Sequence, residues 1–378
     1  MISQIFKRVL SSQSHLKNPN LSFSISILFF SSSSQPRTHK PKPTTTVSEY
    51  LINQHQFSPE AASKASSAVS HLKNPQRSDS VLSFLRESGF SQSQLEETIK
   101  KLPRVLSSDV DKSIRPKFKI FHDLGLSPSD IAEIISSDPW ILWYSSDNRF
   151  GPSISVLKSI LGSDDAVCKA LKLSGWFLKI DLEKSMVPNI EFLKSCGVDS
   201  SAILKFVFKF PRFLMLKHES MVDCVRRADE MGFDRKSKMF LPAIRVLSSM
   251  SLENWGLKLD VFRSLGFSEN DILAVFRRVP LVFGVSKSKI KDMTELLLLS
   301  GNHDISFVVN HPELLLCSPE RRLKPRLKVL QILEDKRILK KKPSLTTVCK
   351  ITDKLFSEKY VLPYANELQL EEQNVERS

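Results

Sequence analysis

The segment IRPKFKIFHDLGLSPSDIAEIISSDPWILWYS, residues 114–145, contains one complete structural unit of this chain. Pro116 suits the first turn of a helix, because its φ angle is already helical and its missing N–H needs no partner there. The apolar residues that follow have helical spacing and end at Gly125, which we expect to cap the helix in a left-handed conformation. The first half of the segment therefore predicts one amphipathic helix.

The second half of the segment predicts another helix and a turn. Ser127 begins this helix, with Pro128 at its first position and Asp130 completing a capping-box pattern. Pro139 ends it, because a proline deep in a helix loses a hydrogen bond and clashes with the preceding turn. Residues 140–143 are apolar and follow as a short turn, which we expect to be of 3₁₀ type.

This unit recurs along the chain. Seven of the eleven glycines lie 34 to 37 residues apart, at Gly89, Gly125, Gly162, Gly197, Gly232, Gly266 and Gly301. The proline-containing turn recurs in phase, at residues 102–106, 138–142, 210–214, 279–283 and 311–315; residues 174–178 and 244–247 occupy the same place without a proline. Such a period is typical of stacked units that are each too small to bury their own apolar face. The sequence predicts an all-α superhelical solenoid of about seven helix–helix–short-turn repeats of roughly 35 residues, over residues 81–342.

A glycine every 35 residues, in phase with an apolar-Pro-x-apolar-Leu turn, resembles the mitochondrial transcription termination factor (mTERF) family in its plant organellar branch. The resemblance covers roughly residues 80–333. It implies a non-enzymatic protein of organellar gene expression that binds double-stranded DNA along the superhelix and regulates transcription or its termination, with the organellar transcription machinery as a partner. Some plant members are associated with RNA, so an organellar RNA-binding factor in splicing or RNA processing is an alternative.

The two ends of the chain differ in composition from the repeats. Residues 1–48 contain six Lys or Arg, many serines and no Asp or Glu, and residues 1–10 read as an amphipathic helix. This composition predicts an organellar transit peptide, for the mitochondrion with the chloroplast as the alternative. A secretory signal is the competing interpretation of the apolar residues 21–30, which are too few for a membrane span.

Between this peptide and the repeats, residues 49–80 read as a linker with an N-terminal capping helix near residues 58–71. Residues 343–378 read as a C-terminal capping helix over 345–362, followed by an acidic, disordered tail.

Positive charge is concentrated in the later repeats. Residues 49–200 carry 18 basic and 19 acidic residues, whereas residues 201–342 carry 27 basic and 16 acidic residues. An excess of cations in a repeat array suits a polyanionic partner, since the phosphates of nucleic acid are also regularly spaced. A protein-binding helical scaffold is a second alternative, but such a scaffold does not need this charge.

The candidate contacts are cations at the recurrent turns and in the densest basic cluster. They are Arg104, Lys205, Lys209, Arg212, Arg277, Arg278, Arg321, Arg322, Lys324 and Arg326. Arginines bind phosphates in bidentate fashion, which positions a protein on nucleic acid without reading its sequence. The competing interpretation of each residue is that a cation near a helix C-terminus stabilises the helix dipole.

Motifs for catalysis or metal binding are missing from the sequence. It has no Gly-x-x-x-x-Gly-Lys-Ser/Thr loop, no Gly-x-Ser-x-Gly elbow and no His-Glu-x-x-His helix. Its five cysteines are far apart and include no Cys-x-x-Cys pair. We therefore expect no enzymatic activity, no cofactor and no metal, and a monomer that binds nucleic acid and no membrane.

Overall fold

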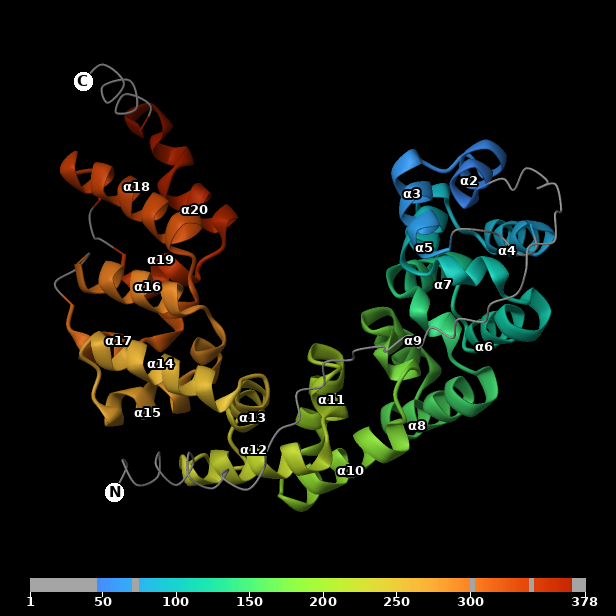
Figure 1. Ribbon diagram of the computed structural model, residues 1–378. Coiled ribbons are helices and arrows are strands. Elements are labelled where there is room, and N and C mark those ends of the chain that lie inside the picture. Colours follow the sequence, from blue (N-terminus) through green and yellow to red (C-terminus); the bar gives the residue numbers. More distant parts are fainter. Residues whose placement is uncertain (1–45, 70–74, 300–302, 340–342, 369–378) are drawn as a thin grey trace, which may run out of the picture. The chain divides into compact units, whose positions relative to one another are not determined.

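A computed structural model describes residues 46–69, 75–299, 303–339 and 343–368, and every regular element in these ranges is helical (Figure 1). The chain divides into two compact units, an N-terminal unit that ends at Glu219 and a C-terminal unit whose repeats begin at Ser220. The amphipathic segment 1–10, the rest of the expected transit peptide up to residue 45, and Gly301 lie outside the described residues.

The N-terminal unit contains the helices α2 to α11, with short turns between them. The α-helices are α2 (Val47–His55), α3 (Pro59–Ala68), α4 (Pro75–Glu87), α5 (Gln92–Lys101), α6 (Arg115–Asp123), α7 (Pro128–Ser137), α8 (Gly151–Leu161), α9 (Asp164–Leu173), α10 (Leu182–Ser195) and α11 (Ser200–Lys209). The 3₁₀ turns are η1 (Pro103–Ser107), η3 (Pro139–Trp143), η5 (Gly175–Leu178) and η6 (Phe213–Met215), and the π turns are η2 (Val110–Ile114) and η4 (Ser146–Phe150).

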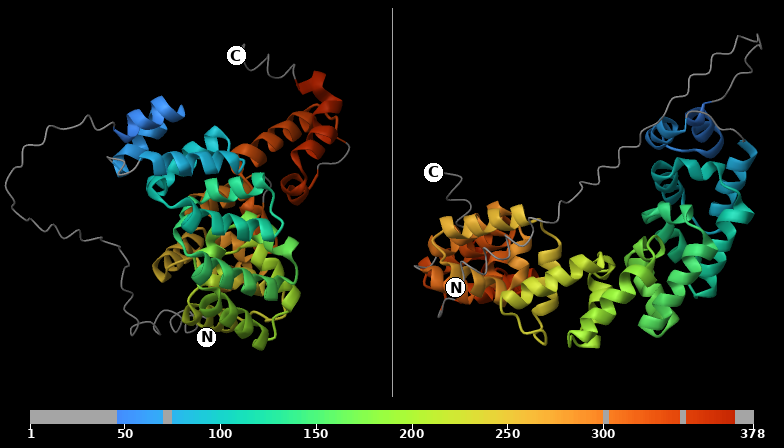
Figure 2. Two further views of the ribbon diagram at one scale, coloured as in Figure 1. Left: turned by 90° about the vertical axis from the view of Figure 1, so that its right-hand side faces the viewer. Right: turned by 60° about the horizontal axis from the view of Figure 1, so that its bottom comes forward.

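These helices form two layers. The second helices of the repeats stack in chain order, α3 on α5, α5 on α7, α7 on α9 and α9 on α11, while α4, α6, α8 and α10 form the other layer (Figure 1). Both further views show the cyan-to-green helices of this unit stacked one on another (Figure 2). Neighbouring first helices also pack on each other, as buried Phe121 of α6 and Phe150 of η4 show with their ring centroids 5.6 Å apart. Each repeat therefore buries its apolar face against its neighbours.

The C-terminal unit contains helices α12 to α20. The α-helices are α12 (His218–Glu230, which spans the boundary), α13 (Phe240–Ser248), α14 (Leu252–Ser264), α15 (Glu269–Arg278), α16 (Lys287–Leu299), α17 (Ile305–Asn310), α18 (Lys324–Asp335), α19 (Leu345–Lys350) and α20 (Asp353–Tyr360). The 3₁₀ turns are η7 (Pro280–Gly284), η8 (Pro312–Leu316) and η10 (Leu362–Tyr364), and η9 (Pro319–Leu323) is a π turn. An aromatic cluster fills its core, with the ring of Trp255 stacked on that of Phe283 at 4.8 Å.

The predicted helix ends are confirmed. Ser127 and Ser268 form capping boxes with Asp130 and Asp271. The six repeat glycines in the described residues all have positive φ angles, from 77° to 92°. At Gly125 a side chain would have open space around it, so the left-handed backbone alone explains the glycine.

The recurrent proline turns are confirmed as 3₁₀ turns, and the two places without proline differ from each other. Gly175 replaces the proline but still begins a 3₁₀ turn, η5. A side chain at Gly175 would meet Cγ2 of Ile141 at 3.1 Å, which accounts for the small residue. By contrast, residues 244–247 lie inside α13, and no turn follows there.

The proline in the first turn of α6 is confirmed, but a turn that we did not predict precedes three of the first helices. A π turn precedes α6, α8 and α18, and each of these helices has a proline in its first turn, at Pro116, Pro152 and Pro325. Within a continuous α-helix a proline ring clashes with the carbonyl four residues earlier. Widening the preceding turn removes this clash, as at other π-bulges.

Both end segments contain more helices than we expected. Residues 46–69 form α2 and α3, joined through Gln56 in a left-handed conformation with φ of 58°, so they repeat the helix–cap–helix pattern. Residues 345–362, predicted as one helix, form α19 and α20. Thr352 ends the continuity, because its hydroxyl accepts a hydrogen bond from the N–H of Leu355 and caps a new helix.

Candidate nucleic-acid interface

Arg104 is the first predicted contact in the chain, and it lies exposed on η1. Its neighbour Lys101 does not point freely into solvent. The Lys101 ammonium donates to the carbonyls of Ser136 and Ser137, at 3.2 and 3.0 Å, which are the last residues of α7 in the next repeat. A cation two residues before the turn proline thus stabilises the C-terminus of the following helix, as the helix dipole favours.

Lys205, Lys209 and Arg212 lie together at the end of α11 and at the start of η6, and all three are exposed. The Lys209 ammonium is 5.5 Å from the ring centroid of Phe210. The Arg212 guanidinium lies 4.4 Å from the ring centroid of Trp176, in the preceding repeat. Lys209 and Arg212 are therefore positioned on aromatic surfaces, and the described residues include no carboxylate that pairs with Arg212.

Arg277 and Arg278, at the end of α15, are exposed but bound within the C-terminal unit. Arg277 donates to the carbonyl of Met231 at 2.5 Å and covers Gly232. Arg278 donates to the carbonyl of Asn310 at 3.2 Å, the last residue of α17. Arg278 thus makes in the C-terminal unit the same kind of helix-capping contact that Lys101 makes in the N-terminal unit.

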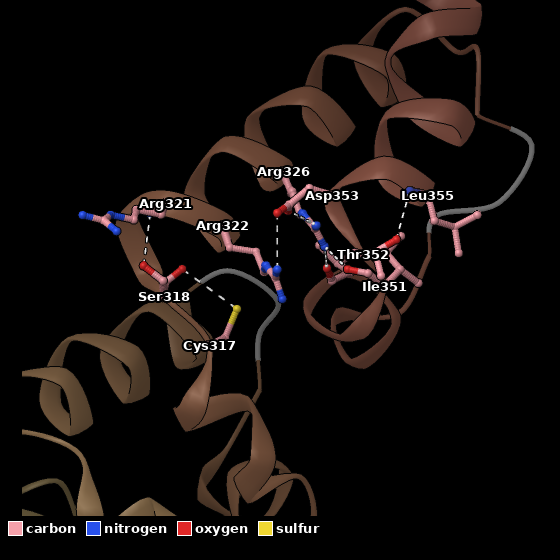
Figure 3. Close-up of polar contacts among 10 residues, drawn as sticks. Cys317, Ser318, Arg321, Arg322, Arg326, Ile351, Thr352, Asp353 and Leu355 are labelled. Atoms are coloured by element: carbon pink, nitrogen blue, oxygen red, sulfur yellow. Dashed lines mark hydrogen bonds and ion pairs between the residues drawn. The ribbon is translucent and has the colours of Figure 1, made fainter. Parts of the chain in front are cut away.

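The basic cluster around α18 separates into two faces. Arg321, Lys324 and Lys328 are exposed, and the side chain of Arg321 points away from α20 (Figure 3). Lys324 pairs with Glu320 at 2.5 Å, but both side chains are more than half exposed, so water screens this pair. We name Arg321, Lys324 and Lys328 the α18 basic face. Lys328 belonged to the predicted cluster but not to the ten candidate contacts.

Arg322 and Arg326 point the other way, toward Asp353 at the start of α20 (Figure 3). Arg326 is only 4% exposed and donates to the carbonyls of Val348 and Ile351, at 2.5 and 2.9 Å, and to Asp353 at 2.5 Å. The Arg326 guanidinium, followed by the charge of Arg322, lowers the pKa of Asp353 below its ordinary value.

Arg326 therefore joins α18 to the α19–α20 junction and does not lie on an accessible surface. The prediction treated it as one more cation in a basic run, because charge alone does not show which side of a helix is buried. Asp353, which receives it, lies 27 residues later in the sequence. We withdraw Arg326 from the candidate interface.

Sequence reasoning also missed a series of internal polar contacts. Asn189, Lys258 and Lys289, each on the first helix of a repeat, donate to a carbonyl 27 residues later, at Leu216, Val285 and Leu316. Ser78 makes the equivalent contact with the carbonyl of Leu106. Burial lowers the pKa of Lys258, with a further contribution from Lys287. One signal in the sequence could have revealed these contacts. It is a polar residue within the apolar stripe of a first helix, 27 residues before the end of the following short turn.

The described parts of the chain offer neither a metal site nor a membrane span. In these ranges no three His, Cys, Asp or Glu side chains come together in a group suited to a metal ion. No helix there is both long enough and apolar enough to cross a bilayer. The candidate ligand-binding features of the described residues are the cations exposed on particular turns and on α18.

Comparison with known proteins identifies the family to which this helical repeat belongs. The mTERF family profile matches residues 82–173 and 144–357, which together cover most of the chain. The chain belongs to the mTERF family. Members of this family are nucleic-acid-binding regulators related to transcription, and their fold is a helical-repeat solenoid.

One relative among curated mTERF proteins is a chloroplast protein of Arabidopsis thaliana, transcription termination factor MTERF8. It is 26% identical over 131 residues, which make up 35% of this chain and 26% of that protein. The matched segment thus spans about a quarter of the relative. The plant branch of the mTERF family, which the repeat pattern indicated, is confirmed.

Proposed function

We propose that this mTERF protein binds double-stranded DNA through its C-terminal unit and regulates organellar transcription or its termination. The observation that supports this proposal best is the α18 basic face, Arg321, Lys324 and Lys328. It lies in the part of the chain, residues 201–342, that carries 27 basic against 16 acidic residues.

The α18 basic face is suited to phosphates because its charges are exposed and little engaged. The guanidinium of Arg321 meets no carboxylate among the described residues, and Glu320 beside Lys324 is 72% exposed. A phosphate could replace Glu320 at small cost, since exposed ion pairs contribute about 1 kcal/mol or less. Each cation that neutralises a phosphate releases a condensed counterion, so binding should weaken steeply as salt is added.

The test compares two sets of exposed cations within the same unit. In the first variant, Arg321, Lys324 and Lys328 are changed to Gln; in the control, the exposed Lys354 and Lys359 of α20 are changed to Gln. Affinity for a 30-base-pair DNA duplex is measured by fluorescence anisotropy between low and physiological salt. The first variant should reduce the slope of log affinity against log salt by about two to three, at roughly 0.9 per phosphate contact.

The control should keep both the affinity and the slope of the wild type. If the first variant binds duplex DNA as the wild type does while its circular dichroism is unchanged, the α18 basic face is not the interface. An RNA duplex that displaces the DNA would favour the RNA-processing alternative. Binding of a protein partner that is insensitive to salt would favour the scaffold alternative.

The organelle, the oligomeric state and the transcription machinery as a partner also belong to this proposal. The amphipathic start of the sequence favours the mitochondrion, whereas the name of the Arabidopsis relative favours the chloroplast. A fluorescent protein fused behind residues 1–48 would distinguish the two organelles, and retention in the cytosol would contradict both. Analytical ultracentrifugation with and without duplex DNA tests the monomer.

A further inference from the structure

Four successive turns of the N-terminal unit carry an arginine or a tryptophan at the same position. These residues are Arg104, Trp140, Trp176 and Arg212, and the step between neighbours is 36 residues each time. Each directly follows Pro103, Pro139, Gly175 or Pro211; the first three of these residues begin η1, η3 and η5, and Pro211 lies two residues before η6. We name these four residues the turn row. Identical steps in a stacked repeat place equivalent side chains along one edge of the stack.

Contacts between neighbouring turns support this arrangement. Gly175 of η5 packs against Ile141 and Asp138 at η3, and Lys179 after η5 pairs with Asp138 at 2.6 Å. The guanidinium of Arg212 then lies over the Trp176 ring at 4.4 Å, and the ammonium of Lys179 lies 4.5 Å from the centroid of the same ring. Trp176 is therefore held between two cations, beside the turn that carries Trp140.

The tryptophans of η3 are not needed for packing. Ile141 and Leu142 fill the core beneath this turn, whereas Trp140 is 51% exposed and Trp143 is 58% exposed. Among the described residues, these two are the exposed aromatic side chains; the other exposed large apolar residues are aliphatic or methionine. A single exposed apolar residue is ordinary. Two exposed indoles on one turn, one of them in a row with a guanidinium at each end, require another explanation.

We propose that the turn row and Trp143 bind single-stranded nucleic acid. Unpaired bases stack on the exposed faces of Trp140 and Trp143, and Arg104 and Arg212 bind the flanking phosphates. Tryptophan stacks with every base, and arginine binds phosphate in bidentate fashion. RNA and DNA single strands share this chemistry. The site is separate from the α18 basic face and goes beyond the duplex binding proposed above.

The charge of the N-terminal unit favours this occupant over a duplex. Residues 49–219 carry 22 basic and 20 acidic residues, so long-range attraction for a polyanion is weak there. Asp138, two residues before Trp140, is already paired with Lys179. Binding at the turn row should therefore depend mainly on stacking, with a small salt dependence that distinguishes it from duplex binding.

The test replaces both exposed indoles, in one variant by side chains that keep an aromatic face and in another by side chains that lack one. The paired variants are Trp140→Phe with Trp143→Phe, and Trp140→Leu with Trp143→Leu; Leu173→Ala, which changes another 58% exposed side chain, is the control. The full chain is titrated with 12-nucleotide single strands of RNA and of DNA and with a DNA duplex. The Leu pair should lose about ten-fold or more in single-strand affinity. The Phe pair should retain most of this affinity, and the control should retain all of it.

Each result decides the proposal. Binding of either single strand with this order of variants supports it, and the arm that binds identifies RNA or DNA. The proposal is overturned if neither strand binds the wild type, or if the Leu pair binds as the wild type does while its circular dichroism is unchanged. Duplex affinity should be the same in all three variants, so failure here leaves the α18 proposal untouched, and the converse also holds.

Discussion

The two units are built from the same repeat, but their exposed cations and aromatic side chains lie at different positions of that repeat. In the N-terminal unit residues 103, 139, 175 and 211 lie 36 residues apart at the successive turns, and the residue after each is Arg or Trp. In the C-terminal unit the turns η7 and η8 begin at Pro280 and Pro312, and the same position holds Leu281 and Glu313. The row of exposed side chains therefore does not continue into the C-terminal unit.

Cations in the C-terminal unit are found instead on helices, and many of them stabilise the unit. Lys258, Lys289 and Arg326 donate to backbone carbonyls, and Arg277 and Arg278 bind helix C-termini. Net charge therefore overstates the surface that is available to a ligand. A run of lysines and arginines in a helical repeat includes both capping groups and ligand contacts, and only the exposed members can be the latter.

The largest expected effect separates the buried and exposed arginines of α18. Arg326→Ala should lower the free energy of unfolding of the C-terminal unit by about 3 kcal/mol, because two carbonyls and Asp353 lose a buried charged donor. Arg321→Ala, five residues earlier and exposed, should change it by less than about 0.5 kcal/mol. Urea denaturation followed by circular dichroism measures both. Equal effects would contradict the division of this cluster into two faces.

A smaller effect distinguishes two half-buried cysteines, one from each unit. A hydrogen bond from Cys349, assisted by the charges of Arg322 and Arg326, lowers the pKa of Cys317 to about 7. Burial, with Asp164 and Asp165, raises the pKa of Cys168 above its ordinary value. Since the thiolate is the nucleophile, iodoacetamide at pH 7 should modify Cys317 about ten-fold faster or more, as peptide mass spectrometry would show.

The sign of the pH dependence follows from these two pKa values. The rate at Cys317 should rise as the pH increases from 6 to 8, as its thiolate forms, and should then level off. Arg322→Gln removes a charge that favours this thiolate and should slow the reaction at pH 7. Equal rates at Cys317 and Cys168 would contradict the lowered pKa of Cys317.

The smallest expected effect concerns the residues that cap the first helices. Arg337 follows α18 with φ of 56°, a left-handed conformation that six repeat glycines and Gln56 also adopt. Arg337→Gly should raise the thermal stability of the C-terminal unit by about 1 kcal/mol. In the N-terminal unit, Gly125→Ala should lower stability by a similar amount, because only backbone strain is introduced there. The same sign for both substitutions in differential scanning calorimetry would be inconsistent with this explanation.

Much of the repeat could be predicted because its signals are local. Ser127 and Asp130 lie within one helical turn of each other, and Gly125 precedes them by two residues, so neighbouring residues decide where these helices begin and end. The lack of a proline marked residues 174–178 and 244–247 as exceptions, but it did not show that only the second segment is helical. The π turns before Pro116, Pro152 and Pro325 were not predicted. These features depend on the backbone conformation that a helix adopts around a proline or an apolar run. The period of the sequence does not describe that conformation.

The candidate interface was harder to predict than the fold. Arg322 and Arg326 have the residue type and spacing expected of phosphate contacts, yet Asp353 and the end of α19 bind them. Trp140 and Trp176 were recognised as parts of turns, but their place in a row with Arg104 and Arg212 depends on how successive turns pack. In both cases the decisive partners are far away in the sequence.

The sequence by itself determined the all-α repeat, its period, the capping residues and the mTERF family, because caps, prolines and apolar stripes act over a few residues and recur. Only the tertiary structure decided which cations are buried, which carbonyls they bind and which aromatic rings remain exposed. The physical reason is that burial and hydrogen bonding depend on side chains brought together from positions about 27 to 36 residues apart. A helix shows no difference between its two sides until a neighbouring helix covers one of them.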